Sequence, residues 1–404
     1  MISTLRSVAR FSLPRFGVSG RLSRAANVAD LRGIARRRLP GGIFDYIDGA
    51  AEDEVTLRSN VDAFASWRFV PRVLRDVSSV DTSTTLFGRS LPVPLILSPT
   101  GFSRIADSQG ELAVARSAAR HELPYCLSTL STRSIEEVAS VSNGDKWFQV
   151  YVWRDRGLTS EMLTRASAAG YSTIAITVDT PVLGRRERDT RRGFTLPPTL
   201  GLSTIVDGIR HPGWTWDFVR GGPITFSNIA AHAGGGTAVT LSEFIAAQFD
   251  PSLSWDDIAW FRERWSGSIV IKGIQSVDDA SLAVHHGVDG VMLSNHGGRQ
   301  LDHAPAPIDL VAPVRDAVGD SLAVICDGGI RRGSDVVKAL ALGADACTMG
   351  RTYLYGLGAA GERGVDTAIE MLTSEMRRTM ALAGLRSLGE ITRDVITPTE
   401  RARR

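Results

Sequence analysis

The sequence is poor in cysteine and lysine, and it has no long apolar run. Its 404 residues include three cysteines, Cys126, Cys326 and Cys347, whose spacing matches no zinc or disulfide framework. Each lies in an apolar run, so we expect buried, reduced thiols in a cytoplasmic protein. No stretch of about 18 apolar residues exists, which excludes a predicted transmembrane helix. A formal net charge of only +2 gives no global attraction to nucleic acid.

The chain ends differ in composition from the rest. Residues 1–28 contain many arginines and no acidic residue. A disordered basic tail is favoured there over a targeting peptide. A second short tail is expected at 397–404, which leaves residues 29–396 as one domain. Lysine occurs only at Lys146, Lys272 and Lys338, so each of these three invites a functional explanation.

From about residue 91, short apolar runs alternate with amphipathic segments that usually end at glycine, as helices do. Continuous apolar strands alternating with helices indicate a parallel sheet covered on both faces. Eight such units predict an α/β fold, a closed TIM (β/α)8 barrel, with an open doubly wound sheet as the alternative. The expected strands are 94–101, 125–130, 147–152, 173–179, 268–273, 290–295, 323–329 and 346–351.

Two segments depart from this alternation. Residues 29–66 have helical spacing and precede the barrel. An insertion at about 185–253 follows the fourth strand and contains the aromatic stretch "HPGWTWDF". Long loops are commonly functional. We interpret this stretch as a loop that is a lid or a membrane-surface contact, or one that packs on the barrel rim.

Polar residues occur where the expected strands end, and barrel enzymes place their chemistry at that end of the strands. Any one of them could be a satisfied core group, but so many at one end of a barrel indicate a ligand. They are Pro99, Thr100, Gly101, Ser128, Gln149, Tyr151, Thr177, Asp179, Lys272, Ser294, His296, Asp327, Gly350 and Arg351.

The last two strand ends indicate a phosphate site. Asp327 begins the glycine-rich stretch "DGGIRRGSD", which holds Gly328, Gly329 and Arg331, and Gly350 with Arg351 follows the eighth strand. Glycine-rich backbone N–H groups, a helix N-terminus and an arginine suit a phosphate. A lysine such as Lys272 would stabilise a ring that gains negative charge on reduction. These features favour FMN over NAD, and no metal site is expected.

The stretch "LSNHGGRQLD", residues 293–302, carries the candidate base. His296 titrates near neutral pH. Arg299 follows three residues later and suits a carboxylate. Asp179, at the end of the fourth strand, could orient the imidazole. Gln300 to Asp302 are interpreted as loop anchors, with Asp302 holding an arginine.

The sequence resembles the FMN-dependent L-2-hydroxy acid dehydrogenases and oxidases, above all bacterial L-lactate and mandelate dehydrogenases. The likeness runs from about residue 29 to 396. It rests on "SNHGGRQLD", the family's active-site signature, and on further motifs. These are "FDYIDGAAEDE", "SPTGF", "LSTLS", "WFQVYVWRDR", "TVDTPVLGRRERD", "IVIKGI", "DGGIRRGSDVVKALALGA" and "GRTYLYGLGAAGERGV".

The resemblance implies a role for each residue. His296 takes a proton from the substrate as a hydride or its equivalent reaches flavin N5, and Asp179 pairs with the imidazolium. Arg299 and Arg186 bind the substrate carboxylate with help from Tyr46, and Tyr151 lies at the reacting hydroxyl. Lys272 faces flavin N1. The isoalloxazine is lined by Pro99, Thr100, Gly101, Ser128, Gln149 and Thr177, with Ser294 also at the cofactor, and Asp327, Gly328, Gly329, Arg331, Gly350 and Arg351 hold ribityl and phosphate.

The expected function is therefore oxidation of L-lactate to pyruvate with electrons passed to quinone or cytochrome, at the inner face of the cell membrane. The resemblance also implies a homotetramer. Leu130 stands where glycolate oxidase has Trp, which favours a larger substrate than glycolate, and Gly101 stands where many oxidases have Ala. An oxygen-using oxidase that produces hydrogen peroxide and an L-mandelate dehydrogenase are alternatives. An FMN barrel isomerase and an inactive flavin-binding protein are more distant ones.

Overall fold

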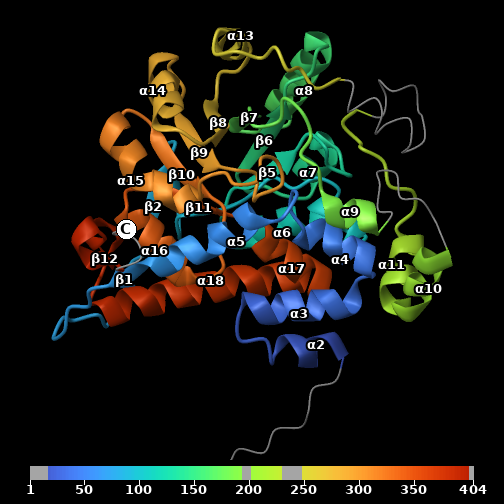
Figure 1. Ribbon diagram of the computed structural model, residues 1–404, viewed down its shortest axis with the longest axis horizontal. Coiled ribbons are helices and arrows are strands. Elements are labelled where there is room, and N and C mark those ends of the chain that lie inside the picture. The colour runs from blue at the N-terminus through green and yellow to red at the C-terminus, as the bar shows by residue number, and fades with distance from the viewer. Residues whose placement is uncertain (1–16, 193–201, 230–247, 400–404) are drawn as a thin grey trace, which may run out of the picture.

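The chain folds into a closed barrel of eight parallel strands (Figure 1). The computed structural model describes residues 17–192, 202–229 and 248–399. The strands follow one another around the barrel in the order β4 to β11, and β11 pairs with β4. The predicted barrel is confirmed, and the open-sheet alternative is wrong. The strands are β4 (Leu95–Leu97), β5 (Tyr125–Ser128), β6 (Lys146–Tyr151), β7 (Thr173–Thr177), β8 (Ser268–Ile274), β9 (Gly290–Ser294), β10 (Ala323–Asp327) and β11 (Ala346–Met349).

Helices cover the outside of the barrel, as the alternating pattern predicts. Side-chain caps begin several of them: Asp155 caps one helix, Ser276 another, and Ser134 with Glu137 forms a capping box. The helices are α6 (Glu111–Arg120), α7 (Ile135–Ser140), α8 (Arg156–Ala168), α13 (Asp257–Arg264), α14 (Val277–His285), α15 (Pro307–Val318), α16 (Gly333–Ala341), α17 (Arg351–Ala360) and α18 (Glu362–Ala383).

A hairpin closes the N-terminal end of the barrel. Strands β2 (Thr84–Leu86) and β3 (Arg89–Leu91) pair antiparallel, and Leu86 and Leu91 join the apolar cluster inside the barrel. The ring of Phe87 lies 5.6 Å from that of Trp147. This core fills the barrel interior, so only the opposite end, the barrel mouth, is available for a ligand. The eight barrel residues in the cluster are Ile96, Cys126, Trp147, Ala175, Val270, Met292, Ile325 and Ala346.

The N-terminal residues form helices, as predicted, and the end of α4 lies beside the barrel mouth. These are α3 (Val28–Arg38), α4 (Gly41–Asp48) and α5 (Val55–Asp62), followed by the 3-10 turn Ala63–Ser66. The predicted tail boundaries are wrong within the described residues. Residues Gly17–Leu22 form helix α2 with Leu22 buried, and β12 (Ile396–Pro398) pairs with β1 (Trp67–Phe69). Packing on α17 and pairing with β1 order these segments.

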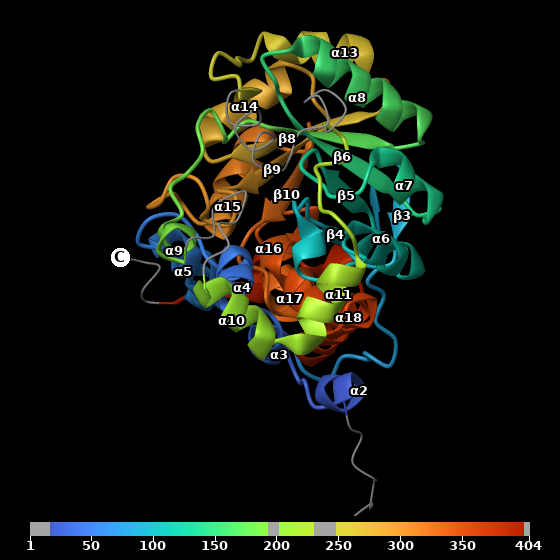
Figure 2. The same ribbon diagram turned by 90° about the vertical axis from the view of Figure 1, so that its right-hand side faces the viewer.

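The described residues of the insertion after β7 form the helices α9 (Glu187–Arg191), α10 (Leu202–Arg210) and α11 (Pro212–Arg220). The prediction of an aromatic loop is wrong, because Pro212 stands at the first helical position and Trp214 stacks on Phe218 one turn later, with ring centroids 4.8 Å apart. Both views place α10 next to α4 (Figures 1 and 2), and Gly41 N donates to Asp207 Oδ2 of α10 at 2.6 Å. Residues 193–201 and 230–247 of the insertion lie outside the described part. No described helix is long and apolar enough to cross a membrane.

Candidate active site

A layer of polar side chains lies directly above the apolar barrel core. Side chains of a strand alternate, so the residue two positions after each core residue points to the same side. At all eight strands that residue is polar, and seven of the eight are buried. Six of these residues are predicted from the sequence. Ser98 and Thr348 are not, although each lies two positions after a core residue, Ile96 or Ala346, in the same alternation. The layer comprises Ser98, Ser128, Gln149, Thr177, Lys272, Ser294, Asp327 and Thr348.

Lys272 and Asp327 form an ion pair at the centre of this layer, with Nζ 3.2 Å from Oδ2. Asp327 also accepts hydrogen bonds from the hydroxyls of Ser98, Ser294 and Thr348. Burial raises the pKa of Asp327, but the Lys272 charge and these hydroxyls outweigh burial and lower it to about 2. Burial opposes the charged form of Lys272, yet Asp327 keeps its pKa above the usual value. A permanent buried cation therefore lies at the floor of the barrel mouth.

Gln149 connects the strands on the other side of the layer. Its Oε1 accepts from Ser128 Oγ at 3.0 Å, and its Nε2 donates to Thr177 Oγ1 at 2.8 Å. All three side chains are buried. This chain of hydrogen bonds fixes the orientation of the amide and of both hydroxyls.

His296 lies between a carboxylate and a phenol. Its Nδ1 is 3.0 Å from Asp179 Oδ1, and its Nε2 is 3.3 Å from the Tyr151 hydroxyl. Burial lowers the pKa of His296 below 6.5, and the Lys272 charge adds to this, although Asp179 opposes it. Burial alone would raise the pKa of Asp179, but the charges on His296 and Lys272 lower it. At neutral pH, Nε2 of a neutral imidazole is therefore an acceptor.

Two arginines and a tyrosine form the upper wall. The guanidinium carbons of Arg299 and Arg186 lie 5.0 and 5.3 Å from the Tyr46 ring centre. Arg299 is half-buried and donates to the carbonyls of Tyr46 and Gly49, with no carboxylate at ion-pair distance among the described residues. Burial and repulsion from Arg186 lower the pKa of Arg299 to about 9. An incoming carboxylate would offset this destabilised charge.

The glycine-rich end lies where β10 and β11 finish. Gly328 and Gly329 have φ values of 145° and 79°, which favour glycine, and helix α17 starts at Arg351. The guanidinium of Arg351 donates to the carbonyls of Ile47, Gly49 and Gly297, so it fastens the N-terminal segment to the signature loop. Arg331 has no carboxylate at ion-pair distance among the described residues, which leaves it for an anion.

A single cavity of about 440 Å³ joins these groups. Asp179, Gln149, Thr177 and Ser294 do not line it and act through their neighbours. Aromatic residues that sequence analysis missed, Phe102, Phe226 and Phe249, form part of its wall. Phe226 and Phe249 come from the insertion, where no periodic pattern indicates them. Predicted residues that line it are Tyr46, Pro99, Thr100, Gly101, Ser128, Tyr151, Arg186, Lys272, His296, Arg299, Asp327, Gly328, Gly329, Arg331, Gly350 and Arg351.

Two of the three residues that follow Arg299, Gln300 and Asp302, are anchors as predicted, whereas the prediction is wrong for Leu301, which is 69% exposed. Gln300 Nε2 donates to the carbonyls of Asp179 and Val182, and its Oε1 accepts from Gly184 N. The predicted arginine partner of Asp302 is wrong, because Asp302 accepts from the backbone N–H groups of residues 55 and 56 at the start of α5. A helix N-terminus favours a carboxylate for the same electrostatic reason as an arginine does.

Comparison with known proteins agrees with this architecture. The model of the FMN-dependent dehydrogenase family matches residues 35–398. L-lactate dehydrogenase of Caulobacter vibrioides is 44% identical over 375 residues, which are 92% of this chain and 97% of that one. L-lactate dehydrogenase of Pseudomonas aeruginosa is 44% identical over 369 residues, 90% and 96% of the two chains.

Solved structures give the same result. The crystal structure of the monotopic membrane protein (S)-mandelate dehydrogenase superposes with a TM-score of 0.90 at 38% identity, covering 93% of this chain and 100% of that one. The crystal structure of mandelate oxidase with (S)-2-phenylpropionate superposes with a TM-score of 0.79 at 37% identity, covering 93% of this chain and 98% of that one. Fold and site together define a flavin-dependent oxidoreductase on a (β/α)8 barrel. The chain belongs to the FMN-dependent dehydrogenase family, and its cofactor is FMN.

Proposed function

We propose that this enzyme oxidises L-lactate to pyruvate and passes the electrons to a quinone or a cytochrome. The observation that carries the proposal is the position of His296, held by Asp179, in the same cavity as Arg299 and Arg186. A base beside two cations is the arrangement that a 2-hydroxy carboxylate requires. The L-lactate dehydrogenases at 44% identity support the substrate.

Arg299 and Arg186 bind the substrate carboxylate in this account. The ring of Tyr46 lies against both guanidinium groups and holds them in place. Asp189 pairs with Arg186 at 3.4 Å, but repulsion from Arg186 and Arg351 still lowers the pKa of Arg299, so a carboxylate ligand would add a counter-charge beside it. Charge-assisted, bidentate hydrogen bonds of this kind also fix the orientation of the substrate.

His296 then accepts the proton of the C2 hydroxyl through Nε2, as the pair of electrons and the hydrogen on C2 leave. Bound FMN supplies the two-electron acceptor for this oxidation. Asp179 stabilises the imidazolium that forms, and the Tyr151 hydroxyl donates to the oxygen that gains charge. Burial raises the pKa of Tyr151, so it remains a neutral donor.

The remaining polar residues would hold FMN. The buried ammonium of Lys272 suits the N1 side of the ring, where negative charge develops on reduction. Arg331 and the N-terminus of α17 suit the phosphate. Gly101 packs closely against Leu130 in the cavity wall, because a Cβ at position 101 would meet the Leu130 carbonyl oxygen at 3.0 Å. The proposed cofactor residues are Pro99, Thr100, Gly101, Ser128, Gln149, Thr177, Lys272, Ser294, Asp327, Gly328, Gly329, Arg331, Gly350 and Arg351.

A larger substrate, L-mandelate, is the second candidate. The aromatic wall of Phe102, Phe226 and Phe249 would pack against an aryl side chain, and rings 102 and 226 lie 5.4 Å apart. The structural likeness to (S)-mandelate dehydrogenase supports this substrate. The mandelate oxidase structure keeps an oxygen-using enzyme as the alternative electron-transfer mode.

We also propose that α10 and α11 contact the membrane surface. Their outward side chains Ile209, Trp216 and Val219 are 62–71% exposed, and Arg220 lies 4.7 Å from the Trp216 ring. An apolar face with arginines at its edge suits an anionic bilayer. Leu183, half exposed, belongs to the wall of the active-site cavity, which would give a lipid-soluble acceptor a short path.

Self-association is proposed from a second apolar surface. Val73 and Leu74 are 80% and 103% exposed, and Arg72 N donates to the Ala383 carbonyl next to exposed Leu382. Burial of this surface between copies of the chain would remove it from water. A tetramer is expected from light scattering of the purified protein, whereas a monomer would contradict the proposal.

Turnover in air tests the assignment of the electron acceptor. Purified enzyme with L-lactate should reduce a quinone analogue rapidly and form little hydrogen peroxide. A panel of L-lactate, L-mandelate and longer L-2-hydroxy acids, compared by kcat/KM, decides the substrate. Rapid peroxide formation with no gain from the quinone would replace the dehydrogenase with an oxidase.

A further inference from the structure

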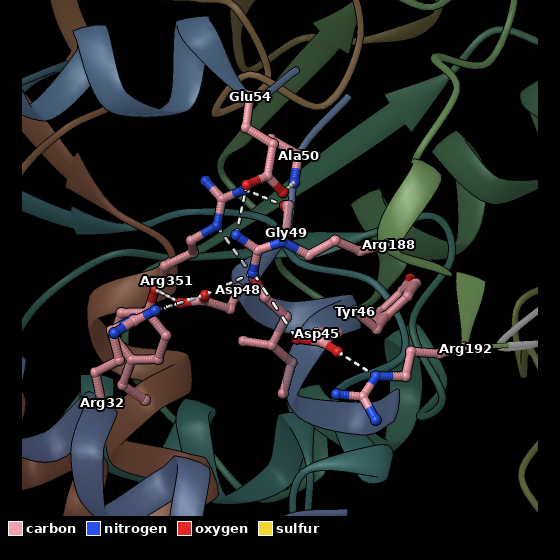
Figure 3. Close-up of polar contacts among 12 residues, drawn as sticks. Arg32, Asp45, Tyr46, Asp48, Gly49, Ala50, Glu54, Arg188, Arg192 and Arg351 are labelled. Atoms are coloured by element: carbon pink, nitrogen blue, oxygen red, sulfur yellow. Dashed lines mark hydrogen bonds and ion pairs between the residues drawn. The ribbon is translucent and has the colours of Figure 1, made fainter. Parts of the chain in front are cut away.

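An ion-pair network joins the two segments that carry Tyr46 and Arg186 (Figure 3). Arg188, in α9, donates through Nη1 to Asp48 Oδ2 at 3.0 Å and through Nη2 to Glu54 Oε2. Asp48 ends α4 and Glu54 precedes α5. One guanidinium therefore connects the insertion to both sides of the turn at residues 49–53.

Asp48 is the buried centre of the network, with 4% of its side chain exposed. Arg32 pairs with it through two bonds of 2.6 and 2.8 Å, and Tyr355 donates to it at 2.8 Å. Burial raises the pKa of Asp48, but the bonds from Arg32, Tyr355 and Arg188 outweigh this and lower it to about 2. Asp48 is therefore ionised at neutral pH and can hold both arginines.

The turn at residues 49–53 also contacts Arg299, the arginine proposed to bind the substrate carboxylate. Glu54 Oε1 accepts from Ala50 N at 3.0 Å, which fixes the peptide after Gly49. The Gly49 carbonyl accepts from Arg299 Nη1 at 3.0 Å. A Cβ at Gly49 would meet the Arg188 side chain at 3.4 Å, so the turn packs directly against Arg188.

The network also aligns the two segments along their backbones. Glu52 N donates to the Arg185 carbonyl at 2.9 Å, next to Arg186. Ala51 N donates to the Gly298 carbonyl at 2.8 Å, next to Arg299. Displacement of residues 48–54 would therefore move Tyr46, Arg186 and Arg299 relative to one another.

We propose that Arg188 is a positioning residue for carboxylate recognition: it ties α9 to the 48–54 turn, so that Tyr46, Arg186 and Arg299 form one binding site. The inference rests on the proposed hydroxy acid chemistry. Arg188 has no contact with the cavity, and its effect passes through Asp48 and Glu54. It governs substrate binding more than the subsequent proton and electron transfer, because the bonds from residues 49–52 go to Arg299 and to the Gly298 and Arg185 carbonyls. The side chains of His296 and Asp179 pair with each other instead.

Arg188→Gln in the holoenzyme is the test, with Arg192→Gln as the matched control. Arg192 lies four residues further on, and within the described part of the chain its ion-pair partner is Asp45, with 59% of the Arg192 side chain exposed. In anaerobic stopped-flow reduction of the flavin, Arg188→Gln should raise the half-saturating L-lactate concentration about ten-fold, with a limiting rate within about two-fold of wild type. Arg188→Lys keeps the positive charge but loses the two-pronged guanidinium, so its half-saturating L-lactate concentration should lie between those of wild type and Arg188→Gln.

Glu54→Gln approaches the same contact from the other side and should shift half-saturation in the same direction. Arg192→Gln should match wild type. Equal behaviour of Arg188→Gln and Arg192→Gln, or a loss confined to the limiting rate, would overturn the inference.

Hydrogen exchange separates this inference from the proposed function. Backbone amides of residues 49–54 should exchange faster in Arg188→Gln than in wild type or Arg192→Gln, whichever substrate the enzyme uses. Unchanged exchange there refutes the positioning role. Failure of every L-2-hydroxy acid to reduce wild-type flavin, with the exchange result intact, refutes the proposed function alone.

Discussion

His296 Nδ1 lies 3.0 Å from Asp179 Oδ1, while the other carboxylate oxygen of Asp179 is buried with no hydrogen-bond partner among the described residues. The charge of Asp179 is therefore shared with few other groups. Hydrogen bonding at Nδ1 holds the imidazole and leaves Nε2, near Tyr151, to accept a proton.

Replacement of His296 by Gln should reduce kcat by about 10² to 10⁴-fold, the usual contribution of a general base. FMN content should stay at one per chain, because the imidazole is not among the proposed cofactor residues. His286→Gln, a substitution at a histidine stacked on Trp255 outside the cavity, is the control. Turnover at the wild-type rate in His296→Gln would contradict the proposed base.

The pH profile should report the lowered pKa of His296. Because the neutral imidazole is the active form, kcat/KM should rise with pH as His296 loses its proton. The rise should level off at higher pH, and its midpoint should report a His296 pKa below 6.5. Asp179 raises the pKa of His296, so Asp179→Asn should move this limb to lower pH and also reduce kcat. A rise in kcat/KM that moves to higher pH in Asp179→Asn would refute the charge interaction between Asp179 and His296.

Arg299→Met should weaken substrate binding. Loss of a charge-assisted hydrogen-bond pair is worth about 1.5–3 kcal/mol, or about 10- to 100-fold in KM. Initial rates over a range of L-lactate concentrations measure it. Leu301→Ala, two residues further on and 69% exposed, should leave KM unchanged. A wild-type KM in Arg299→Met would place the carboxylate elsewhere.

Gln300→Leu should lower kcat by about ten-fold, because small displacements of catalytic groups are costly. Gln300 is the link between the Asp179 carbonyl and the Gly184 amide, so its loss frees the loop that carries Asp179. Gly273 adds to the constraint, since a Cβ there would meet the Asp179 Cβ at 2.8 Å. Activity equal to that of Leu301→Ala would show that the link is dispensable.

The double variant Ile209→Asp with Val219→Asp should lose binding to vesicles that contain anionic lipid. Both side chains lie on the exposed face of α10 and α11, and charges there oppose insertion into the interface. Co-sedimentation measures the bound fraction. Leu282→Asp with Val61→Asp, at exposed positions on α14 and α5, should bind as wild type does. Equal binding of both double variants would argue against this surface.

Periodicity predicts the barrel and most of its polar layer, because strand alternation and burial act locally. Ser98 and Thr348 obey the same alternation, whereas Phe226 and Phe249 belong to no repeating element. Tyr46 reaches the site through long-range contacts: Arg351 and Arg299 hold the carbonyls around it. Only resemblance, not pattern, could indicate that position.

Local signals were also misjudged in two places. The aromatic stretch that begins at Pro212 is a helix, because its spacing lets Trp214 stack on Phe218 and donate to the Ile105 carbonyl at 2.7 Å. Asp302 accepts hydrogen bonds from the start of α5, more than 240 residues earlier in the chain. The Ile105 carbonyl that Trp214 contacts and the α5 amides that Asp302 contacts are both distant in the sequence, so local pattern could not indicate either.

Anaerobic titration of the purified holoenzyme with L-lactate tests the central claim most directly. The account predicts that L-lactate bleaches the flavin absorbance fully and forms one pyruvate per FMN, that D-lactate does not, and that a quinone analogue restores the colour faster than oxygen. Flavin that stays oxidised with L-lactate and with every other L-2-hydroxy acid would contradict it.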